Sequence, residues 1–454
     1  MKIAVVGTGY VGLVSGACFA EIGHEVVCVD IDASKTARIN RGESPISEDG
    51  LDELLTRNVR AGRLSATTDL ESAMAGAAVS FIAVGTPFDG RTIDLQYVRQ
   101  AARDIGTVLR SSTAYHVVCV KSTVVPGTTE EVVGPILEEQ SGRTIGGDLG
   151  LAMNPEFLAE GTAVKDFMQP DRIVIGAVDE RSAEVINQLY DRFKGTDVVV
   201  TRPATAEMIK YASNSFLATV ISFANEIANL CTAVGGVDVV DVLSGVHLDR
   251  RLSPITPQGR IRPGLMSFLF PGTGFGGSCF PKDAKALISF GQQLGEPMRI
   301  LSAVLETNRH QPGVTLDLVR AELGDVRGRR VAVLGLAFKP GTDDVRESPA
   351  EPIIRGLAAD GALVVAHDPI AIEPMQRVLT DVPVEYCADL KQALAGVDAV
   401  ILVTSWPEYA ALPELLAGID VPMIDGRRFL DPGSFTRYRA IGRRALDRPF
   451  PPLR

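Results

Sequence analysis

Residues 2–22 of this 454-residue chain read KIAVVGTGYVGLVSGACFAEI. A short apolar run leads into three glycines, Gly7, Gly9 and Gly12, and an apolar stretch of helical character follows them. In such a turn the first glycine permits a tight bend, the second lets the backbone approach a pyrophosphate, and the third lets helix and strand pack closely. The helix N-terminus adds N–H donors and a partial positive charge. These residues therefore predict a dinucleotide-binding turn.

An acidic residue follows where a dinucleotide site needs one. A second apolar run, residues 25–29, ends on Asp30, eighteen residues beyond Gly12. Its carboxylate would accept hydrogen bonds from the adenosine ribose and would repel the 2′-phosphate of NADP, which favours NAD. The alternative is a tight turn in a Rossmann-shaped scaffold that has lost its ligand.

Strand-like and helical segments alternate along the first part of the chain. Further strand-like runs lie at 79–84, 116–120, 150–153 and 172–175. Strands alternating with helices predict an α/β fold with a doubly wound parallel sheet. We expect an NAD-binding Rossmann-like domain over residues 1–200.

The remaining chain predicts two more domains. Residues 205–231 contain no Pro or Gly and are apolar on more than one face, as in helices buried between domains or at a subunit interface. We expect a central helical domain over 201–305. Residues 330–335, RVAVLG, echo KIAVVG at 2–7 and open a second Rossmann-like domain over 306–454. Its turn, GLAFKP, lacks the glycine pattern, so it binds something other than a dinucleotide, or nothing.

Composition excludes several classes of protein. With 45 Lys+Arg against 56 Asp+Glu the net charge is -11, which argues against a general nucleic-acid binder. The six cysteines form no CxxC pair and the five histidines are isolated, so neither a disulfide framework nor a metal site is expected. No apolar run reaches about 18 residues, and the chain shows no signal-peptide cleavage site. We expect a soluble cytoplasmic protein without a membrane segment.

A second glycine-rich segment carries a cysteine. Residues 271–283 read PGTGFGGSCFPKD, and Pro281 suits the first turn of a helix. Cys279 would then precede a helix N-terminus with Lys282 nearby, where a thiolate is stabilised and nucleophilic. A lone cysteine is more often a small buried hydrophobe. We favour a nucleophile, because Cys279 alone among the six cysteines lies in a glycine-rich loop beside charges.

Three other segments offer polar groups for catalysis. Lys210 and Asn214 are four residues apart and so share a helix face, where they could polarise an oxygen. Glu156 and Glu160 follow a predicted strand, at the sheet edge where ligands of parallel sheets bind. The segment 121–129, KSTVVPGTT, brings hydroxyls to the same edge, and a hydroxyl with a carboxylate could position water. Each of the last two segments alone is equally well explained as a cap or turn.

Together these motifs resemble the nucleotide-sugar dehydrogenases of the UDP-glucose/GDP-mannose dehydrogenase family. In chain order they are GTGYVGL at 7–13, VGTP at 84–87, KSTVVPGTT at 121–129, NPEFLAEGTAVKDF at 154–167, PDRIVIG at 170–176, KYASNSFLATVISFANE at 210–226, PGTGFGGSCFPKD at 271–283 and GLAFKPGTDDVRESP at 335–349. The cysteine loop looks like that of the members that oxidise UDP-glucose. The resemblance implies an N-terminal NAD domain, a central helix joining two protomers into a homodimer, and a C-terminal domain holding the UDP group.

Carried over, the resemblance implies a four-electron oxidation of UDP-glucose to UDP-glucuronate at C6 with two NAD reduced to NADH. Asp283 and a water would act as base in the first oxidation, and Cys279 would attack the aldehyde to give a thiohemiacetal and then a thioester. Lys210 and Asn214 would stabilise the oxyanions. Thr123 and Glu156 would position the water that hydrolyses the thioester.

The resemblance also implies two sets of binding residues. Those expected to contact NAD are Gly7, Gly9, Tyr10, Val11, Gly12, Asp30, Lys35, Thr86, Thr123, Glu160 and Arg346. Those expected to contact the nucleotide sugar are Glu156, Phe157, Leu158, Glu160, Lys210, Asn214, Phe270, Gly274, Phe275, Gly276, Cys279, Phe338, Lys339, Arg427 and Arg262. The family places an arginine of the neighbouring subunit at the site. Here Arg251, Arg260 and Arg262 are all candidates, because the stretch before the glycine-rich loop is longer than usual.

Other functions stay open. The nearest alternative function is the same oxidation of GDP-mannose or of a UDP-N-acetylhexosamine, although the family members that oxidise these sugars carry variant cysteine loops. A non-catalytic sensor of NAD or nucleotide sugar is a second, but a sensor has no need of Cys279, Lys210, Asn214 and Asp283 together. A two-electron hydroxyacid dehydrogenase has no use for Cys279.

Overall fold

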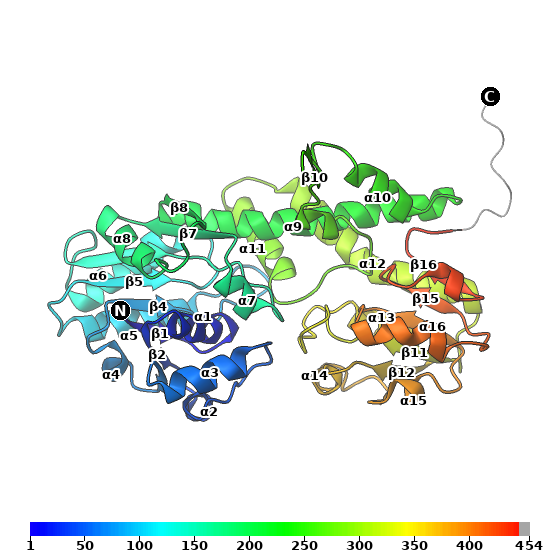
Figure 1. Cartoon of the computed structure of the whole chain (residues 1–454), viewed down its shortest axis with the longest axis horizontal. Helices are drawn as coiled ribbons and strands as arrows, with labels where there is room; N and C mark the ends of the chain where they lie inside the picture. Colours follow the sequence, from blue (N-terminus) through cyan, green and yellow to red (C-terminus); the bar gives the residue numbers. More distant parts are fainter. Residues whose placement is uncertain (445–454) are drawn as a thin grey trace. The chain divides into compact units, whose positions relative to one another are not determined.

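The computed structural model describes residues 1–444, which form two compact units. Unit 1 comprises residues 1–213 and 289–294, and unit 2 comprises the remaining residues from 214 onward. Helix α9 (Pro203–Val234) passes from unit 1 into unit 2, so one continuous helix contributes residues to both. Figure 1 shows the chain coloured along its sequence, with unit 1 in blue to green.

Unit 1 is built on an eight-stranded sheet with the order β3-β2-β1-β4-β5-β6-β7-β8. The strands are β1 (Lys2–Val6), β2 (Glu25–Val29), β3 (Leu64–Thr67), β4 (Val79–Ile82), β5 (His116–Val120), β6 (Leu149–Met153), β7 (Arg172–Ala177) and β8 (Asp197–Thr201). All neighbours pair in parallel except β6 and β7, which are antiparallel. This departs from the purely parallel sheet that the sequence predicts. The connection between β6 and β7 contains only a six-residue helix, α7 (Ala163–Met168), and a helix of about 9 Å is too short to return the chain to the opposite edge.

Helices cover both faces of this sheet. Because successive side chains of a strand point to opposite faces, Ile3 and Val5 enter one core and Ala4 enters the other. The first core is closed by α1 (Tyr10–Glu21), α3 (Leu51–Arg60), α7 and α8 (Glu180–Gln188). The second is closed by α4 (Leu70–Met74), α5 (Gln96–Leu109) and α6 (Gly134–Ser141). Helix α2 (Ala33–Asn40) and the π-helix η1 (Thr128–Val133) complete the unit.

Unit 2 contains a six-stranded parallel sheet with the order β13-β12-β11-β14-β15-β16. The strands are β11 (Arg330–Leu334), β12 (Leu363–His367), β13 (Val384–Tyr386), β14 (Ala399–Leu402), β15 (Met423–Asp425) and β16 (Tyr438–Ala440). The helices that follow β11 along the chain are α13 (Ala350–Ala359), α14 (Ile372–Val378), α15 (Leu390–Ala393) and α16 (Leu412–Leu415). One hydrophobic core unites sheet and helices, so this second Rossmann-like body is packed independently of the first.

The first part of unit 2 is helical. It contains residues 214–234 of α9, α10 (Val239–His247), residues 280–288 of α11 (Phe280–Gln293) and α12 (Arg299–Leu323). A two-stranded hairpin, β9 (Ile255–Thr256) and β10 (Gly259–Arg260), follows α10. The chain then enters the glycine-rich loop at 271–279, which ends where α11 begins.

Helix α9 is, by length and composition alone, apolar enough to cross a membrane. Core helices of water-soluble proteins have the same composition when they are covered on several faces. Near its N-terminal end, Glu207 and Lys210 are buried and bonded to loops of unit 1. These contacts favour a helix of the protein core.

Candidate functional site

The predicted dinucleotide turn lies between β1 and α1. Gly7 has a φ of +102°, which L side chains rarely adopt, and a Cβ there would lie 2.5 Å from the carbonyl oxygen of Ala83. Gly9 caps α1 without a side-chain hydrogen bond, and a Cβ built on it meets no atom within 4 Å. The turn thus leaves open space beside Gly9 at the N-terminus of α1, the end of a helix that suits a pyrophosphate.

Asp30 lies directly after β2 and faces this turn. Its carboxylate accepts hydrogen bonds from the backbone N–H and the hydroxyl of Thr8, and from the N–H of Asp32 at 3.0 Å. Burial opposes ionisation of Asp30, but these hydrogen bonds outweigh it and lower its pKa. A carboxylate held ionised beside an open glycine turn fits the ribose of NAD. When NAD is bound there it supplies a hydride acceptor.

Other predicted NAD residues lie around the same turn or on neighbouring strand ends. Thr86, after β4, donates its hydroxyl to the carbonyl of Thr123, after β5, at 2.8 Å. Lys35 lies in the first turn of α2, which Asp32 caps. Tyr10 and Val11 open α1. Arg346 belongs to unit 2, where it pairs with Asp344 at 2.7 Å.

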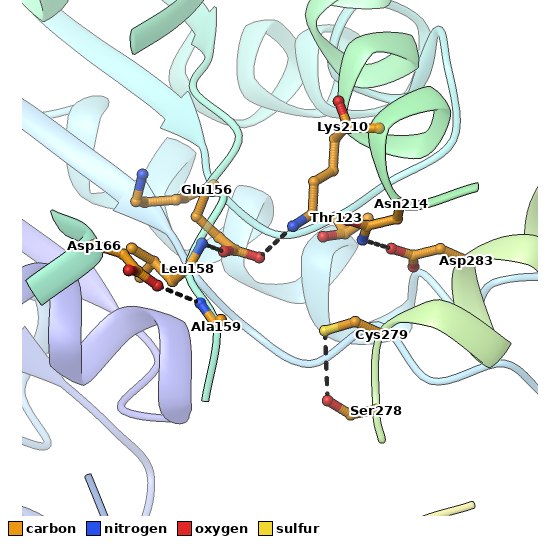
Figure 2. Close-up of polar contacts among 12 residues, drawn as sticks. Thr123, Glu156, Leu158, Ala159, Asp166, Lys210, Asn214, Ser278, Cys279 and Asp283 are labelled. Atoms are coloured by element: carbon orange, nitrogen blue, oxygen red, sulfur yellow. Dashed lines mark hydrogen bonds and ion pairs between the residues drawn. The ribbon is translucent and has the colours of Figure 1, made fainter. Parts of the chain in front are cut away.

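Unit 1 also holds a buried ion pair between two predicted catalytic residues. Lys210 Nζ lies 2.9 Å from Glu156 Oε1, and both side chains are buried (Figure 2). The second oxygen of Glu156 accepts the N–H of Leu158 at 2.6 Å. Burial alone would raise the pKa of Glu156, but the Lys210 ammonium and the Leu158 N–H outweigh burial and lower it. The carboxylate is therefore held ionised in a fixed orientation.

Phe157 is held between two cations in the same unit. The guanidinium carbon of Arg172 lies 3.8 Å from the centre of its ring and Lys210 Nζ lies 5.6 Å from it. A cavity of about 180 Å³ lies beside this loop, with Lys121, Glu156 and Arg172 in its wall. Lys121 is buried and donates to Asn154 Oδ1 at 2.9 Å, and burial lowers its pKa to about 8.

In unit 2 the glycine-rich loop is pinned by side chains of two helices. Asn225 of α9 accepts the N–H of Gly272 at 2.8 Å, and Asn308 of α12 binds both the N–H and the carbonyl of Phe275 at 2.7 and 2.9 Å. A Cβ on Gly276 would lie 2.3 Å from the carbonyl oxygen of Glu347, so only glycine fits this close approach. The loop backbone is thus fixed before any ligand binds.

Cys279 emerges from this loop one residue before α11 begins. Its carbonyl accepts the N–H of Asp283, one helical turn later, at 2.8 Å. Asp283 is buried, and its two oxygens lie 2.6 Å from Asn214 Nδ2 and 2.6 Å from Lys282 Nζ. Figure 2 shows the Asn214 amide pointing at Asp283. Unit 2 therefore combines a partly exposed thiol with an oriented carboxylate.

The predicted sugar-nucleotide residues of unit 2 gather around the glycine-rich loop or contact it. The Phe338 ring lies 2.8 Å from a Cβ built on Gly277. Arg427 donates to the carbonyl of Gly274 at 3.1 Å, and burial lowers its pKa to about 10. Phe275 packs edge-on against Phe280, and Lys339 lies over the Phe338 ring. Phe270 is half-buried just before the loop.

The three candidate arginines differ in their surroundings. Arg251 is exposed and paired with Asp249 at 2.5 Å. Arg260 donates to the carbonyls of Leu248 and Ser253 at 3.0 and 2.8 Å. Arg262 is exposed and has no hydrogen bond or ion pair with residues 1–444. Arg251 and Arg260 are therefore held by contacts within their own chain.

The second Rossmann-like turn is filled by the protein itself. Asp368, just after β12, is buried and accepts the N–H groups of Leu336 and Ala337 at 2.7 and 3.1 Å. It also accepts the indole N–H of Trp406 at 3.0 Å. Thr8 of the first turn donates its N–H to Asp30 in the same way, so the second turn differs by the additional bonds that Asp368 accepts from Ala337 and Trp406. These bonds and the missing glycines distinguish it from the turn after β1.

Sequence reasoning missed the residues that hold the loops. Asn225 lies eleven residues after Asn214, about three helical turns, so the two share a face of α9 and this polar stripe was a signal for Asn225. Asn308 and Glu207 had no such signal: Asn308 is one of six consecutive polar residues at 306–311, and Glu207 is an isolated acid on an apolar helix. Within residues 1–444 no group of three or more His, Cys, Asp or Glu side chains is placed to hold a metal ion.

A dinucleotide turn that specifies NAD, in one chain with a loop cysteine beside an oriented carboxylate, defines an NAD-dependent oxidoreductase. Three domain models of the UDP-glucose/GDP-mannose dehydrogenase family match the chain: the NAD binding domain over residues 1–194, the central domain over 204–310 and the UDP binding domain over 332–432.

Individual relatives agree. UDP-glucose 6-dehydrogenase AglM of Haloferax volcanii is 46% identical over 436 residues, which is 95% of this chain and 97% of that protein. The solved structure of a UDP-glucose dehydrogenase from Pyrobaculum islandicum is 43% identical, with a TM-score of 0.88 and 97% of each chain covered. That of a UDP-D-ManNAc dehydrogenase from Pyrococcus horikoshii is 30% identical, with a TM-score of 0.82 and 98% and 99% covered.

The chain belongs to the UDP-glucose/GDP-mannose dehydrogenase family. This confirms the family, the α/β fold and the NAD cofactor that the sequence predicted.

Proposed function

We propose that this chain oxidises UDP-glucose to UDP-glucuronate at C6, through a thiohemiacetal and a thioester on Cys279. The observation that carries the proposal is the position of Cys279, at the start of α11 and one turn before Asp283, which Asn214 orients at 2.6 Å. The choice of sugar is supported by two relatives at 43% and 46% identity whose names specify UDP-glucose.

In the first oxidation the C6 alcohol loses a proton and a hydride. Asp283 takes the proton through a water, since its side chain is held in place by Asn214 and Lys282. The Asn214 amide and the Lys210 ammonium stabilise the charge that develops on the oxygen. The glycine turn after β1 and Asp30 would hold the NAD that supplies the hydride acceptor.

The second oxidation uses the thiol. Cys279 Sγ bonds to the aldehyde carbon, and the carbonyl oxygen gains a proton, which gives a tetrahedral thiohemiacetal that can release a second hydride. Loss of this hydride and of the hydroxyl proton gives a thioester. Water, oriented by Glu156 and Thr123, adds to the thioester carbon, and the sulfur leaves as the thiol. One alcohol and one water thus become one carboxylic acid, and two NAD are reduced.

A panel of sugars tests the substrate. Purified full-length chain with excess NAD is offered UDP-glucose, UDP-galactose, UDP-N-acetylglucosamine or GDP-mannose, and kcat/KM is measured for each. We expect UDP-glucose to exceed the others by at least about a hundredfold, since a pocket that hydrogen-bonds one sugar leaves polar groups unpaired with another. Preference for a different sugar would contradict the substrate, and NAD binding without turnover of any sugar would favour a sensor.

We also propose a homodimer formed through α9, without a membrane and in the cytoplasm. Phe216, Phe223 and Leu230 of α9 are 55%, 49% and 59% exposed. They are seven residues apart, so they form one apolar stripe along the helix. Such a stripe on a helix that carries catalytic residues suits the seam between two copies. Arg262, exposed and without a partner in residues 1–444, is then the arginine we assign to the neighbouring subunit's site.

A further inference from the structure

Glu48 joins three segments of unit 1. The hydroxyl of Tyr10 donates a hydrogen bond to its carboxylate. The N–H of Gly161 lies 2.6 Å from Glu48 Oε2 and the N–H of Ala163 lies 2.6 Å from Glu48 Oε1. Gly161 also donates to the Tyr10 hydroxyl at 3.2 Å. Both carboxylate oxygens are therefore used, and a tyrosine and two backbone groups converge on them.

Each of these segments has a separate task. Tyr10 is the first residue of α1, directly after the glycine turn that holds the dinucleotide. Glu48 lies in the loop that precedes α3. Gly161 and Ala163 flank the start of α7, at the end of the segment that carries Glu156 and Glu160. The carboxylate thus links the cofactor turn to the loop of the proposed catalytic site.

The hydrogen bonds have a fixed direction. Burial, followed by the hydrogen bond to Glu48, raises the pKa of Tyr10, so its hydroxyl keeps its proton and acts as the donor. Backbone N–H groups at the start of a helix lack partners within the helix, and an ionised carboxylate is their strongest acceptor. Loss of the Glu48 charge would weaken all of these bonds together.

The other end of the loop is anchored to the sheet. Asn154 follows β6. Its side-chain oxygen accepts a hydrogen bond from the Lys121 ammonium, and its side-chain amide donates one to the carbonyl of Val174 at 2.8 Å. From Asn154 to Gly161 the chain has no regular secondary structure except a turn at its end. The bonds of Gly161 and Ala163 to Glu48 join the distal end of this loop to α1 through Tyr10, beside the apolar packing of α7 on α1.

We propose that Glu48 is a positioning residue that couples occupation of the dinucleotide turn to the order of residues 154–163, so that the cofactor and the nucleotide sugar bind cooperatively. The proposal rests on the proposed function for the identity of the sugar. Cofactor at the N-terminus of α1 restrains Tyr10, and Tyr10 restrains the loop through Glu48. Coupling is reciprocal, so the sugar tightens cofactor binding by the same factor.

Calorimetry with NADH and UDP-glucose, a pair that cannot react, measures this coupling in the full-length chain. We expect UDP-glucose to tighten NADH binding roughly tenfold, within the range usual for coupled sites. In Glu48→Gln and in Tyr10→Phe the factor should fall below about two, because an amide cannot accept both N–H groups and phenylalanine has no hydroxyl. Glu138→Gln is the matched control, since Glu138 accepts the N–H of Ile145 at 2.9 Å away from this network.

Hydrogen exchange at Gly161 and Ala163 gives a second readout that needs no sugar. We expect NADH to slow exchange of these two amides in the unaltered chain and to have no such effect in Glu48→Gln. Unchanged coupling in both variants, or equal loss of coupling in Glu138→Gln, would overturn the proposal. If Glu48→Gln does not fold, Tyr10→Phe decides, because it removes a single hydroxyl. If UDP-glucose does not bind, the proposed function fails while the exchange measurement still tests Glu48.

Discussion

The Lys210–Glu156 ion pair joins two side chains that are only 3% and 5% exposed. These two buried charges are tolerated because they neutralise each other, and because the second oxygen of Glu156 accepts the N–H of Leu158. The Glu156 carboxylate fixes the position of the Lys210 ammonium. A pair of this kind serves orientation more than stability, since an apolar replacement of both partners is often neutral.

Removing one partner should therefore be costly. Lys210→Met leaves Glu156 buried without its cation, and we expect the free energy of unfolding to fall by about 3 kcal/mol in urea denaturation. The double variant Lys210→Met/Glu156→Gln should regain most of that loss and remain inactive. Lys285→Met, which breaks the exposed Lys285–Glu347 pair, should cost under about 1 kcal/mol. Equal losses in the two single variants would contradict the buried pair.

The cysteines show why exposure matters for reactivity. Cys28 and Cys119 are buried in the unit 1 cores, and burial raises the pKa of each to about 12. A thiol with so high a pKa is inert near neutral pH. Cys279 is partly exposed at the end of a loop that other residues fix. This contrast separates the proposed nucleophile from cysteines that pack as small apolar residues.

Among the secondary structure elements, η1 and α9 are joined by one buried carboxylate. Glu207 of α9 accepts the N–H groups of Gly127 and Thr129 at 2.6 and 2.8 Å and the hydroxyl of Thr129 at 2.6 Å. It thereby ties the segment after β5, which carries Thr123, to the helix that carries Lys210. Burial nevertheless raises the pKa of Glu207 to about 7, because desolvation exceeds the effect of these donors.

This raised pKa predicts a pH dependence of stability. Between pH 4.5, near the unfolded pKa, and pH 7, the folded chain binds a proton at Glu207 that the unfolded chain does not, so the stability from this group is lost as pH rises. Relative to Glu207→Gln, the free energy of unfolding of the unaltered chain should fall by about 2 kcal/mol across that window. Denaturation of both proteins at several pH values measures it. A difference between the two proteins that does not change with pH would refute the prediction.

The sequence predicted those helices and strands whose own residues show an apolar or glycine pattern. Strand β1, the glycine turn and α1 were predictable because apolar run, glycines and helix follow each other within 20 residues. Strands β13 and β16 were not, since each has three residues and includes charged or polar side chains. The reversed strand β7 was not predictable either, because its direction depends on the short connection through α7 rather than on its own apolar pattern.

The residues of the candidate site also divide into those that the sequence predicts and those that it does not. Cys279, Asp283, Lys210 and Asn214 stand in recognisable motifs, so neighbours in the sequence were enough to propose them as site residues, and their catalytic roles stay predictions. The contacts of Asn308 with Phe275 and of Glu48 with Gly161 join residues 33 and 113 positions apart. Single polar residues give no sign of such partners. Only the folded chain shows which ordinary Asn and Glu side chains fix the loops.

For the whole molecule the apolar stripe on α9 predicts the assembly. Phe223→Asp places a charge at the middle of Phe216, Phe223 and Leu230, and burying it against a second copy would be unfavourable. We expect light scattering to give twice the chain mass for the unaltered protein and the single chain mass for Phe223→Asp. Ile419→Asp, which is 54% exposed on another surface, is the control and should stay dimeric. A dimeric Phe223→Asp would show that α9 is not the seam.

The central claim is that one chain carries out two successive oxidations through a covalent bond to Cys279. The direct test is the number of NADH formed per UDP-glucose consumed, with limiting sugar, excess NAD and the purified protein. We predict two NADH per sugar, with UDP-glucuronate as product, and loss of this turnover in Cys279→Ala. One NADH per sugar with release of an aldehyde, or two NADH per sugar from Cys279→Ala, would contradict the thioester route.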